Sequence, residues 1–186
     1  MINIKKTILV IFFFLQSCME PDTEKLWNIS IENIFETKGF ARSVIVEGSR
    51  AYVAAGQSGS QIWDLQGNDL VKDFTGYEEG GTFLEFEDLA LIVRDPVNNL
   101  LFLSESNQDV KIFHLDETDS LIYRNTIMSA RTKDFVAFPS RADQFVMYSA
   151  DNDDGLKWHF YNLDSTSSFG IEFIEWTPYG GSEIYT

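Results

Sequence analysis

The stretch that decides the fold spans residues 40–65 and reads FARSVIVEGSRAYVAAGQSGSQIWDL. It holds three short runs of β-branched and aromatic residues, at positions 44–46, 51–53 and 62–65. Each run is too short for a helix, and glycine and serine separate the runs from one another. The pattern therefore predicts three strands of an antiparallel meander.

The same order of strands returns twice along the chain, and each repeat carries a fourth strand. The second repeat has its apolar runs at 91–93, 101–103 and 112–115, and the third has them at 135–138, 145–148 and 160–163. The fourth strands are expected at 70–75, 121–127 and 169–176. The leucines that close the third strands, Leu65, Leu115 and Leu163, lie 50 and 48 residues apart, a spacing typical of propeller blades.

These repeats predict an all-β fold, a β-propeller built of four-stranded antiparallel blades. About three blades are present within residues 26–186, at 40–81, 82–130 and 131–180, with the start of a fourth at 182. Closed rings contain about four to eight blades, so we expect a partial ring, either a fragment or a chain that closes by pairing with another copy. Ahead of the first blade, the alternation at 26–35 predicts a strand, and a helix is the alternative.

The N-terminus has the features of an export signal. Residues 1–17 combine two lysines, an apolar run too short to span a membrane, and Leu15-Gln16-Ser17 directly before Cys18. This order resembles the lipobox of bacterial lipoproteins, in which the signal is cleaved and the cysteine is lipidated. The resemblance implies a signal peptide at 1–17, an acidic tether at 18–25 and attachment to a membrane through Cys18. Because Cys18 is the only cysteine, a disulfide within the chain is impossible.

The residue after Cys18 bears on the location of the protein. In Gram-negative lipoproteins an aspartate at that place favours the inner membrane, whereas this chain has Met19. The resemblance therefore implies a protein that is lipid-anchored in the outer membrane, either facing the periplasm or exposed at the cell surface.

The chain carries a strong negative charge. Lys and Arg total 14 against 29 Asp and Glu, which gives a formal net charge of −15 at pH 7. Such a surface repels the phosphates of nucleic acids, so we expect no nucleic-acid partner. For the same reason, attachment to an anionic membrane has to be covalent or hydrophobic rather than electrostatic.

Residues 41–65 resemble the LVIVD-type β-propeller repeat of bacterial extracytoplasmic proteins. In that repeat a first strand, a Tyr-Val-Ala second strand and an Ile-x-Asp-Leu third strand recur. The later repeats of this chain depart from it, with His114 and Asn162 where the first has Asp64. The resemblance implies a binding or scaffolding propeller whose ligand is a protein, a glycan or a cation, and it transfers no catalytic residue.

The sequence shows no motif that defines an enzyme. His114 and His159 lie in third strands of different blades without the spacing of a metal site, and we interpret both as structural. A nucleophile elbow, a Walker loop and a dinucleotide fingerprint are all missing, so no cofactor is expected. The alternative is a periplasmic propeller hydrolase or oxidoreductase whose axial catalytic residues lie partly outside this sequence.

Acidic residues gather in loops that a propeller places on one face. There, the hairpins between second and third strands emerge beside the loops between blades. Glu78 and Glu79 belong to the loop at 76–81, and Glu105 and Asp109 belong to the second hairpin. We expect these four residues on the binding face.

The third such hairpin, at residues 151–155, resembles the start of a calcium loop. Asp151, Asp153 and Asp154 are its candidate ligands. However, the glycine comes one position early, and Asn162 stands where a bidentate glutamate is needed. The favoured interpretation is a turn rich in Asp, Asn and Gly that binds calcium weakly if at all.

Overall fold

The computed structural model describes residues 30–127, 131–141, 144–151, 155–163 and 171–178. The chain divides into two units, Met1–Ile34 and Phe35–Thr186. In the first unit, the described residues 30–34 form neither a helix nor a strand. All the elements below belong to the second unit. Nowhere in the described ranges is there a helix long and apolar enough to cross a membrane.

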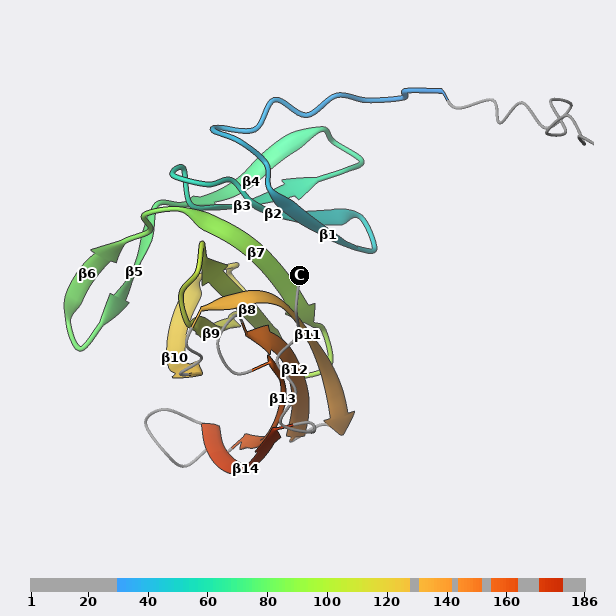
Figure 1. Ribbon diagram of the computed structural model, residues 1–186. Helices are drawn as coiled ribbons and strands as arrows, with labels where there is room; N and C mark the ends of the chain where they lie inside the picture. Colours follow the sequence, from blue (N-terminus) through green and yellow to red (C-terminus); the bar gives the residue numbers. More distant parts are fainter. Residues whose placement is uncertain (1–29, 128–130, 142–143, 152–154, 164–170, 179–186) are drawn as a thin grey trace, which may run out of the picture. The chain divides into compact units, whose positions relative to one another are not determined.

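Three four-stranded antiparallel sheets, here called blades 1, 2 and 3, contain most of the strands (Figure 1). Blade 1 consists of β1 (Ser43–Glu47), β2 (Arg50–Ala54), β3 (Ser60–Asp64) and β4 (Asp69–Phe74). Blade 2 consists of β7 (Leu89–Asp95), β8 (Leu100–Glu105), β9 (Val110–Leu115) and β10 (Leu121–Ile127). Blade 3 consists of β11 (Thr132–Arg141), β12 (Gln144–Asp151), β13 (Gly155–Leu163) and β14 (Ile171–Pro178). Neighbouring strands pair in chain order, which confirms the predicted four-stranded antiparallel sheets.

Several turns within the blades use residues that tolerate a left-handed backbone. Asn68, Asn99, Asn107 and Asp119 have φ values between 54° and 58°, and each lies between two consecutive strands of a blade. The short polar side chains of Asn and Asp allow this conformation more readily than other side chains do. These residues therefore allow the chain to reverse direction in short turns between consecutive strands.

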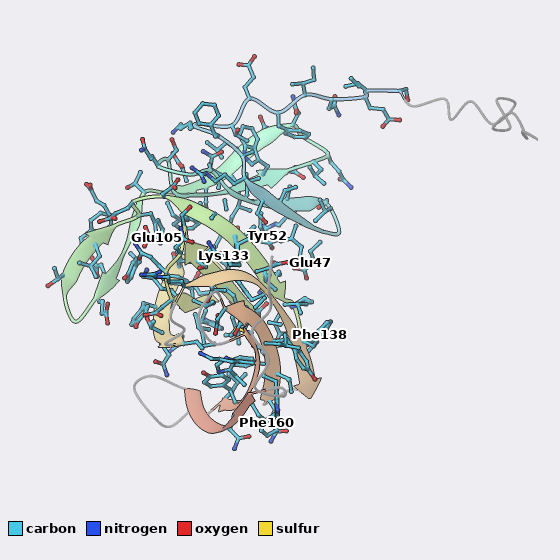
Figure 2. All side chains as sticks on the ribbon, in the orientation of Figure 1. Glu47, Tyr52, Glu105, Lys133, Phe138 and Phe160 are labelled. Atoms are coloured by element: carbon cyan, nitrogen blue, oxygen red, sulfur yellow. The ribbon has the colours of Figure 1, made fainter. Side chains whose placement is uncertain are left out.

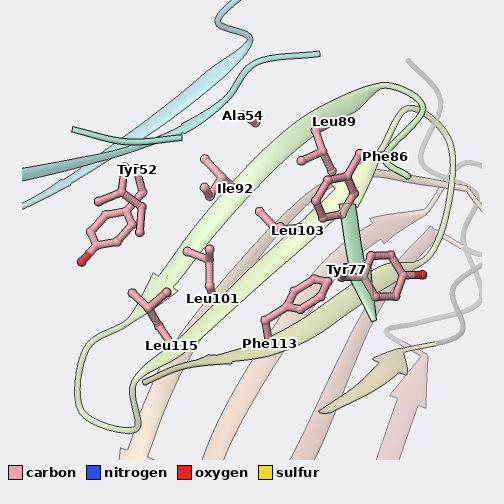
Figure 3. Close-up of a cluster of buried hydrophobic side chains, with 11 residues drawn as sticks. Tyr52, Ala54, Tyr77, Phe86, Leu89, Ile92, Leu101, Leu103, Phe113 and Leu115 are labelled. Carbon is pink, nitrogen blue, oxygen red and sulfur yellow. The ribbon is translucent and has the colours of Figure 1, made fainter. Parts of the chain in front are cut away.

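Apolar side chains pack between neighbouring blades, because successive residues of a strand point to opposite faces. The cluster between blades 1 and 2 comprises Tyr52, Ala54, Ile62, Tyr77, Phe86, Leu89, Ile92, Leu101, Leu103, Phe113 and Leu115 (Figure 3). The cluster between blades 2 and 3 comprises Leu100, Phe102, Val110, Ile112, Ile127, Phe135, Ala137, Phe145, Met147 and Tyr161. Strand β8 contributes to both clusters, and all of its residues are buried.

Blade 3 has an apolar outer face, which is the face opposite to the one that packs on blade 2. Its members share one side of the sheet by register: Val136, Phe138, Val146, Tyr148, Trp158 and Phe160. Phe138 is 52% exposed, and Phe160 is half-buried. Figure 2 labels both side chains.

Two expectations about secondary structure need correction. The strand predicted at 26–35 is wrong for its described part, because Ile31 and Ile34 are 79% and 74% exposed and no strand pairs with residues 30–35. The loop expected at 76–81 instead forms a hairpin of β5 (Gly76–Glu79) and β6 (Thr82–Glu85). Its two-residue turn consists of glycines with positive φ, which is the chemistry that such a turn requires. The predicted signal peptide, the tether and the start of a fourth blade at 182 lie outside the described residues.

Candidate binding surface

One side of the blades, here called the loop face, brings together the turns between second and third strands and the residues that lead into first strands. The N–H of Gly56, in the β2–β3 turn, donates to Leu89 O at 3.1 Å, and Leu89 N–H donates back to Gly56 O at 3.0 Å. This pair joins blade 1 to the start of β7. Because β7 contacts both β1 and β11, the first strands of the three blades adjoin, as the inner strands of a propeller do.

Arg42, Asp88 and Ser106 connect blades 1 and 2 on the loop face. Arg42 Nη2 lies 2.8 Å from Asp88 Oδ1, and Arg42 Nη1 donates to Ser106 Oγ at 3.4 Å. Ser106 Oγ donates in turn to Asp88 Oδ2 at 2.9 Å. The Arg42 side chain is 44% exposed, so this pair adds little stability. Its effect is to hold the β8–β9 turn against the residues that lead into β1 and β7.

Glu105, at the end of β8, makes a more deeply buried connection. Its side chain is 7% exposed, and its Oε2 lies 2.9 Å from the Nζ atom of Lys111 in β9. Its Oε1 accepts the backbone N–H groups of Glu87 and Asp88. The carboxylate therefore ties the β8–β9 hairpin to the residues that lead into β7. Glu105, a binding-face candidate in the sequence analysis, thus has a carboxylate that Lys111 and the two N–H groups already engage.

Blade 3 repeats this arrangement with Asp151 and Lys157. Asp151 Oδ2 lies 3.0 Å from Lys157 Nζ, and Asp151 Oδ1 accepts a hydrogen bond from Thr132 Oγ1 at 3.2 Å. Thr132 begins β11, so this carboxylate also ties a hairpin to a first strand. Ser149 Oγ completes the group by donating to Asp151 Oδ2 at 3.4 Å.

Gln61 occupies the corresponding position in blade 1. It faces Val53 across the β2–β3 pair, as Lys111 and Lys157 face second-strand residues in the other two blades. Gln61 is fully buried. Its Nε2 donates to Lys38 O at 3.0 Å, and its Oε1 accepts from Trp63 Nε1 at 3.1 Å. Each blade thus places one long polar side chain at this position, buried in blades 1 and 3 and half-buried in blade 2, and each of these side chains has a polar partner.

A pocket of about 170 Å³ lies between blades 2 and 3 on the loop face. Its lining comes from β7, the end of β8 with the turn that follows, and β11: Ala90, Leu91, Glu105, Ser106, Asn107, Thr132 and Lys133. Figure 2 labels Glu105 and Lys133. Lys133 is exposed, and its ammonium donates to Asn107 Oδ1. Because Lys111 neutralises Glu105, Lys133 supplies the charge that a ligand would meet.

The β5–β6 hairpin, inserted between blades 1 and 2, is anchored by Tyr77. The Tyr77 ring packs against the rings of Phe86, Phe113 and Tyr123 at centroid separations of 5.5, 5.2 and 5.3 Å. Burial, and to a smaller extent the charge of Glu79, raises the pKa of Tyr77 to about 12, so its hydroxyl stays protonated. Beyond this anchor the hairpin is open to solvent.

The four acidic residues expected on the binding face do not converge. Glu78 and Glu79 are exposed on β5, Asp109 is half-buried in the β8–β9 turn, and Glu105 is buried in the wall of the pocket. The hairpin and the pocket are therefore two separate candidate surfaces.

The two histidines lie in the packed part of the blades. His159 is 4% exposed, and its Nε2 lies 3.3 Å from Ser149 Oγ. Burial lowers its pKa. His114 is half-buried, and its pKa is lowered by burial and by the positive charge of Arg124. Both rings therefore favour the neutral form.

Of the three candidate calcium ligands, Asp151 lies within the described residues. Within the described ranges, no three His, Cys, Asp or Glu residues gather closely enough to hold a metal ion. The Asp151 carboxylate is engaged by Lys157, whose ammonium competes with any cation. Asp153 and Asp154 lie outside the described residues, as does Cys18.

Sequence reasoning missed the two pairs of a buried acid with a lysine, Glu105 with Lys111 and Asp151 with Lys157. A signal for them is present, because Lys111 and Lys157 each stand between two apolar residues in a third strand. A lysine at such a position is buried only with a partner. The acids available as partners are Glu105 and Asp151, each of which ends the strand before the one that contains the lysine.

Comparison with solved structures identifies the architecture. The chain matches the β-propeller domain of Myceliophteria thermophila Cps50 (Swd1) with a TM-score of 0.52 and 6% identity, covering 77% of this chain and 44% of that one. It matches U3-55K with a TM-score of 0.55 and 12% identity, over 76% of this chain and 40% of that one. Saccharomyces cerevisiae Sqt1 matches with a TM-score of 0.52 and 12% identity, over 78% and 35%. The fold is a β-propeller. At these identities the similarity shows the propeller fold alone.

Sequence comparison adds a short match to curated proteins. A probable malate:quinone oxidoreductase of Xylella fastidiosa (strain 9a5c) is 26% identical over 100 residues, which are 54% of this chain and 17% of that protein. The protein of the same description from strain M12 is 25% identical over the same lengths. The chain thus matches about a sixth of the length of these relatives. No protein-family model matches the chain, so the resemblance to the LVIVD-type repeat stays a prediction.

Proposed function

We propose that this chain is the β-propeller binding module of a bacterial outer-membrane lipoprotein, anchored through Cys18, and that its loop face binds a protein. The observation that carries the binding role is the pocket between blades 2 and 3, with the exposed Lys133 in its wall. The propeller fold by itself hosts many functions, so the proposal rests on this site. The resemblance of residues 41–65 to the LVIVD-type repeat supports the same role.

The chemistry of the pocket favours an acidic group as ligand. Lys133 offers an ammonium, Ser106 and Asn107 add polar groups, and Ala90 and Leu91 add apolar surface. A volume of about 170 Å³ suits one side chain rather than a whole small molecule, because typical ligand pockets are about 300–1,000 Å³. An Asp or Glu side chain of a partner protein fits these features better than a cation does.

The acyl anchor accounts for attachment to the membrane. The net charge of −15 gives no attraction to anionic lipids. Several acyl chains on Cys18 hold a protein stably, at about 0.8 kcal/mol per buried methylene. The residues Leu15 to Cys18 support this part of the proposal, and Met19 supports the outer membrane as the location.

Site-specific crosslinking tests the loop face. A photo-crosslinking residue at Asn107, in the pocket wall, is compared with one at Lys72, which is exposed on β4. In cells that make the full chain, we expect a discrete protein adduct from position 107 and none from position 72, and we expect Lys133→Glu to remove the adduct. Equal labelling from both positions, or no adduct from position 107, would overturn the proposed binding face.

Fatty-acid labelling tests the anchor separately. The full chain should incorporate a labelled fatty acid and sediment with membranes, and Cys18→Ser should do neither. Absence of label on the unaltered chain would refute the lipoprotein part of the proposal and leave the binding part standing.

A further inference from the structure

Strand β6 of the inserted hairpin presents an unpaired edge. β5 is its only partner among the described strands. On the other side of the hairpin, β5 contacts β10, and Figure 1 shows β6 beyond β5 as seen from β10. All four residues of β6, Thr82–Glu85, are exposed. Backbone N–H and C=O groups along such an edge are free to pair with another extended chain.

The face of the hairpin that points away from its anchor combines an aromatic ring with acids. The register places Phe83 opposite Glu78 and Glu85 opposite Gly76, so Glu78, Phe83 and Glu85 share one face while Tyr77 lies on the other. Phe83 is 54% exposed, and Leu84 on the Tyr77 side is 38% exposed. Surface strands rarely leave large apolar side chains so accessible beside an open edge.

The Phe83 ring covers the backbone of Gly76 on the neighbouring strand. A Cβ added to Gly76 would lie 2.7 Å from Phe83 Cζ, so the ring lies across Gly76 and fills the space that a side chain would occupy.

We infer that the edge of β6 is a docking site for an extended basic segment of a partner protein, which adds as a third strand to the hairpin. The open edge supplies main-chain pairing. Glu78 and Glu85 supply charge complementarity to lysine or arginine side chains on one face of the hairpin, and Leu84 contacts an apolar residue on the other face. This inference deepens the proposed binding role and rests on it, because it names the class of partner and a second surface that holds it.

A peptide titration tests the docking site on the full chain. The probe is a fluorescent eight-residue peptide of alternating lysine and valine, and the control peptide alternates glutamate and valine. We expect saturable binding of the lysine peptide only, weaker at 300 mM than at 50 mM salt. Hydrogen exchange in the complex should protect amides within residues 82–85.

Two pairs of charge-neutralising variants test whether the lysine peptide binds at the β5–β6 hairpin or to negative charge elsewhere on the chain. Glu78→Gln combined with Glu85→Gln removes two charges from the hairpin face, and Glu117→Gln combined with Asp69→Asn removes two exposed charges elsewhere. The first pair should weaken binding of the lysine peptide by about three- to tenfold, and the second should leave it nearly unchanged.

Three outcomes would overturn the inference: no binding of the lysine peptide, equal weakening by both variant pairs, or binding without protection at residues 82–85. The loop-face crosslink at Asn107 is independent of the hairpin. Failure of the peptide test with an intact crosslink therefore removes the hairpin site and leaves the proposed function in place.

Discussion

Glu105 Oε2 lies 2.9 Å from Lys111 Nζ, with the two side chains 7% and 13% exposed, and Asp151 and Lys157 form the same kind of pair one blade later. In both blades the acid ends the second strand and the lysine belongs to the third. The acid also binds a group that leads into or begins the first strand of the same blade. These ion pairs therefore hold the turns between second and third strands against the starts of the first strands, beneath the residues exposed on the loop face.

The Glu105–Lys111 pair should be costly to break. Glu105→Gln leaves the Lys111 ammonium buried without its counter-charge, and we expect a loss of about 3 kcal/mol in the free energy of unfolding. Urea unfolding of the variant and the unaltered protein measures this loss of stability. Glu105→Gln combined with Lys111→Met should recover part of the loss, because no unpaired charge then remains buried. An equal or larger loss in the double variant would contradict this account.

His159 should make stability depend on pH. Burial lowers its pKa in the folded protein below the usual value near 6.5, so below that value the unfolded chain binds more protons than the folded one. The His159 contribution is then complete above about pH 6.5 and is lost as the pH falls below it. Urea unfolding at pH 7.5, 6.5 and 5.5 should show declining stability, with a smaller decline in His159→Gln. Identical pH profiles would remove His159 as a cause.

Gly59 should resist substitution. It has a φ of +79°, and an added Cβ would lie 2.0 Å from Phe74 O, the backbone oxygen at the end of β4. Gly59→Ala therefore combines a strained backbone with a clash, and we expect a loss above about 2 kcal/mol. Gly48 is the matched control, because it has a φ of +58° with no atom near the added Cβ. Gly48→Ala should cost only about 1 kcal/mol, and a similar cost at both positions in thermal or urea unfolding would count against the clash.

Calcium should bind the 151–155 hairpin at millimolar concentrations or not at all. Asp151 already pairs with Lys157 and accepts from Thr132 and Ser149, so a cation would have to displace these partners. Affinities of about 10⁻³ M are typical of weak extracellular sites. Calorimetry with the full chain and with Asp153→Ala should give the same weak signal. A micromolar site that Asp153→Ala abolishes would reverse this interpretation.

The strands were predictable because their apolar runs are short, β-branched and bounded by turn residues. The start of β13 could not be predicted in this way, because Lys157 and His159 interrupt the apolar pattern of Gly155–Leu163. Both side chains are nevertheless buried, because Asp151 and Ser149 on β12 give them polar partners. These partners lie on another strand, so local periodicity could not reveal them.

The candidate site was predictable only in part. The sequence indicated which loops share a face, and Glu78 and Glu79 are indeed exposed. It did not indicate that Glu105 is buried, because burial of that acid depends on Lys111 six residues later in the next strand. It also missed the β5–β6 hairpin, since charged and apolar residues mix within strands of only four residues.

The complete burial of β8 has a consequence for the order in which the molecule opens. Blade 2 packs against a neighbouring cluster on each of its two faces, so the amides of β8 exchange with water only after both contacts have opened. The described outer face of blade 3, in contrast, is already partly exposed. Native-state hydrogen exchange should therefore be slowest at Leu101–Leu103 and faster in β12, with local opening that starts from blade 3. Blade 2 would then be the last part of the chain to lose its structure, and the pocket at its border with blade 3 would disappear while blade 2 is still folded.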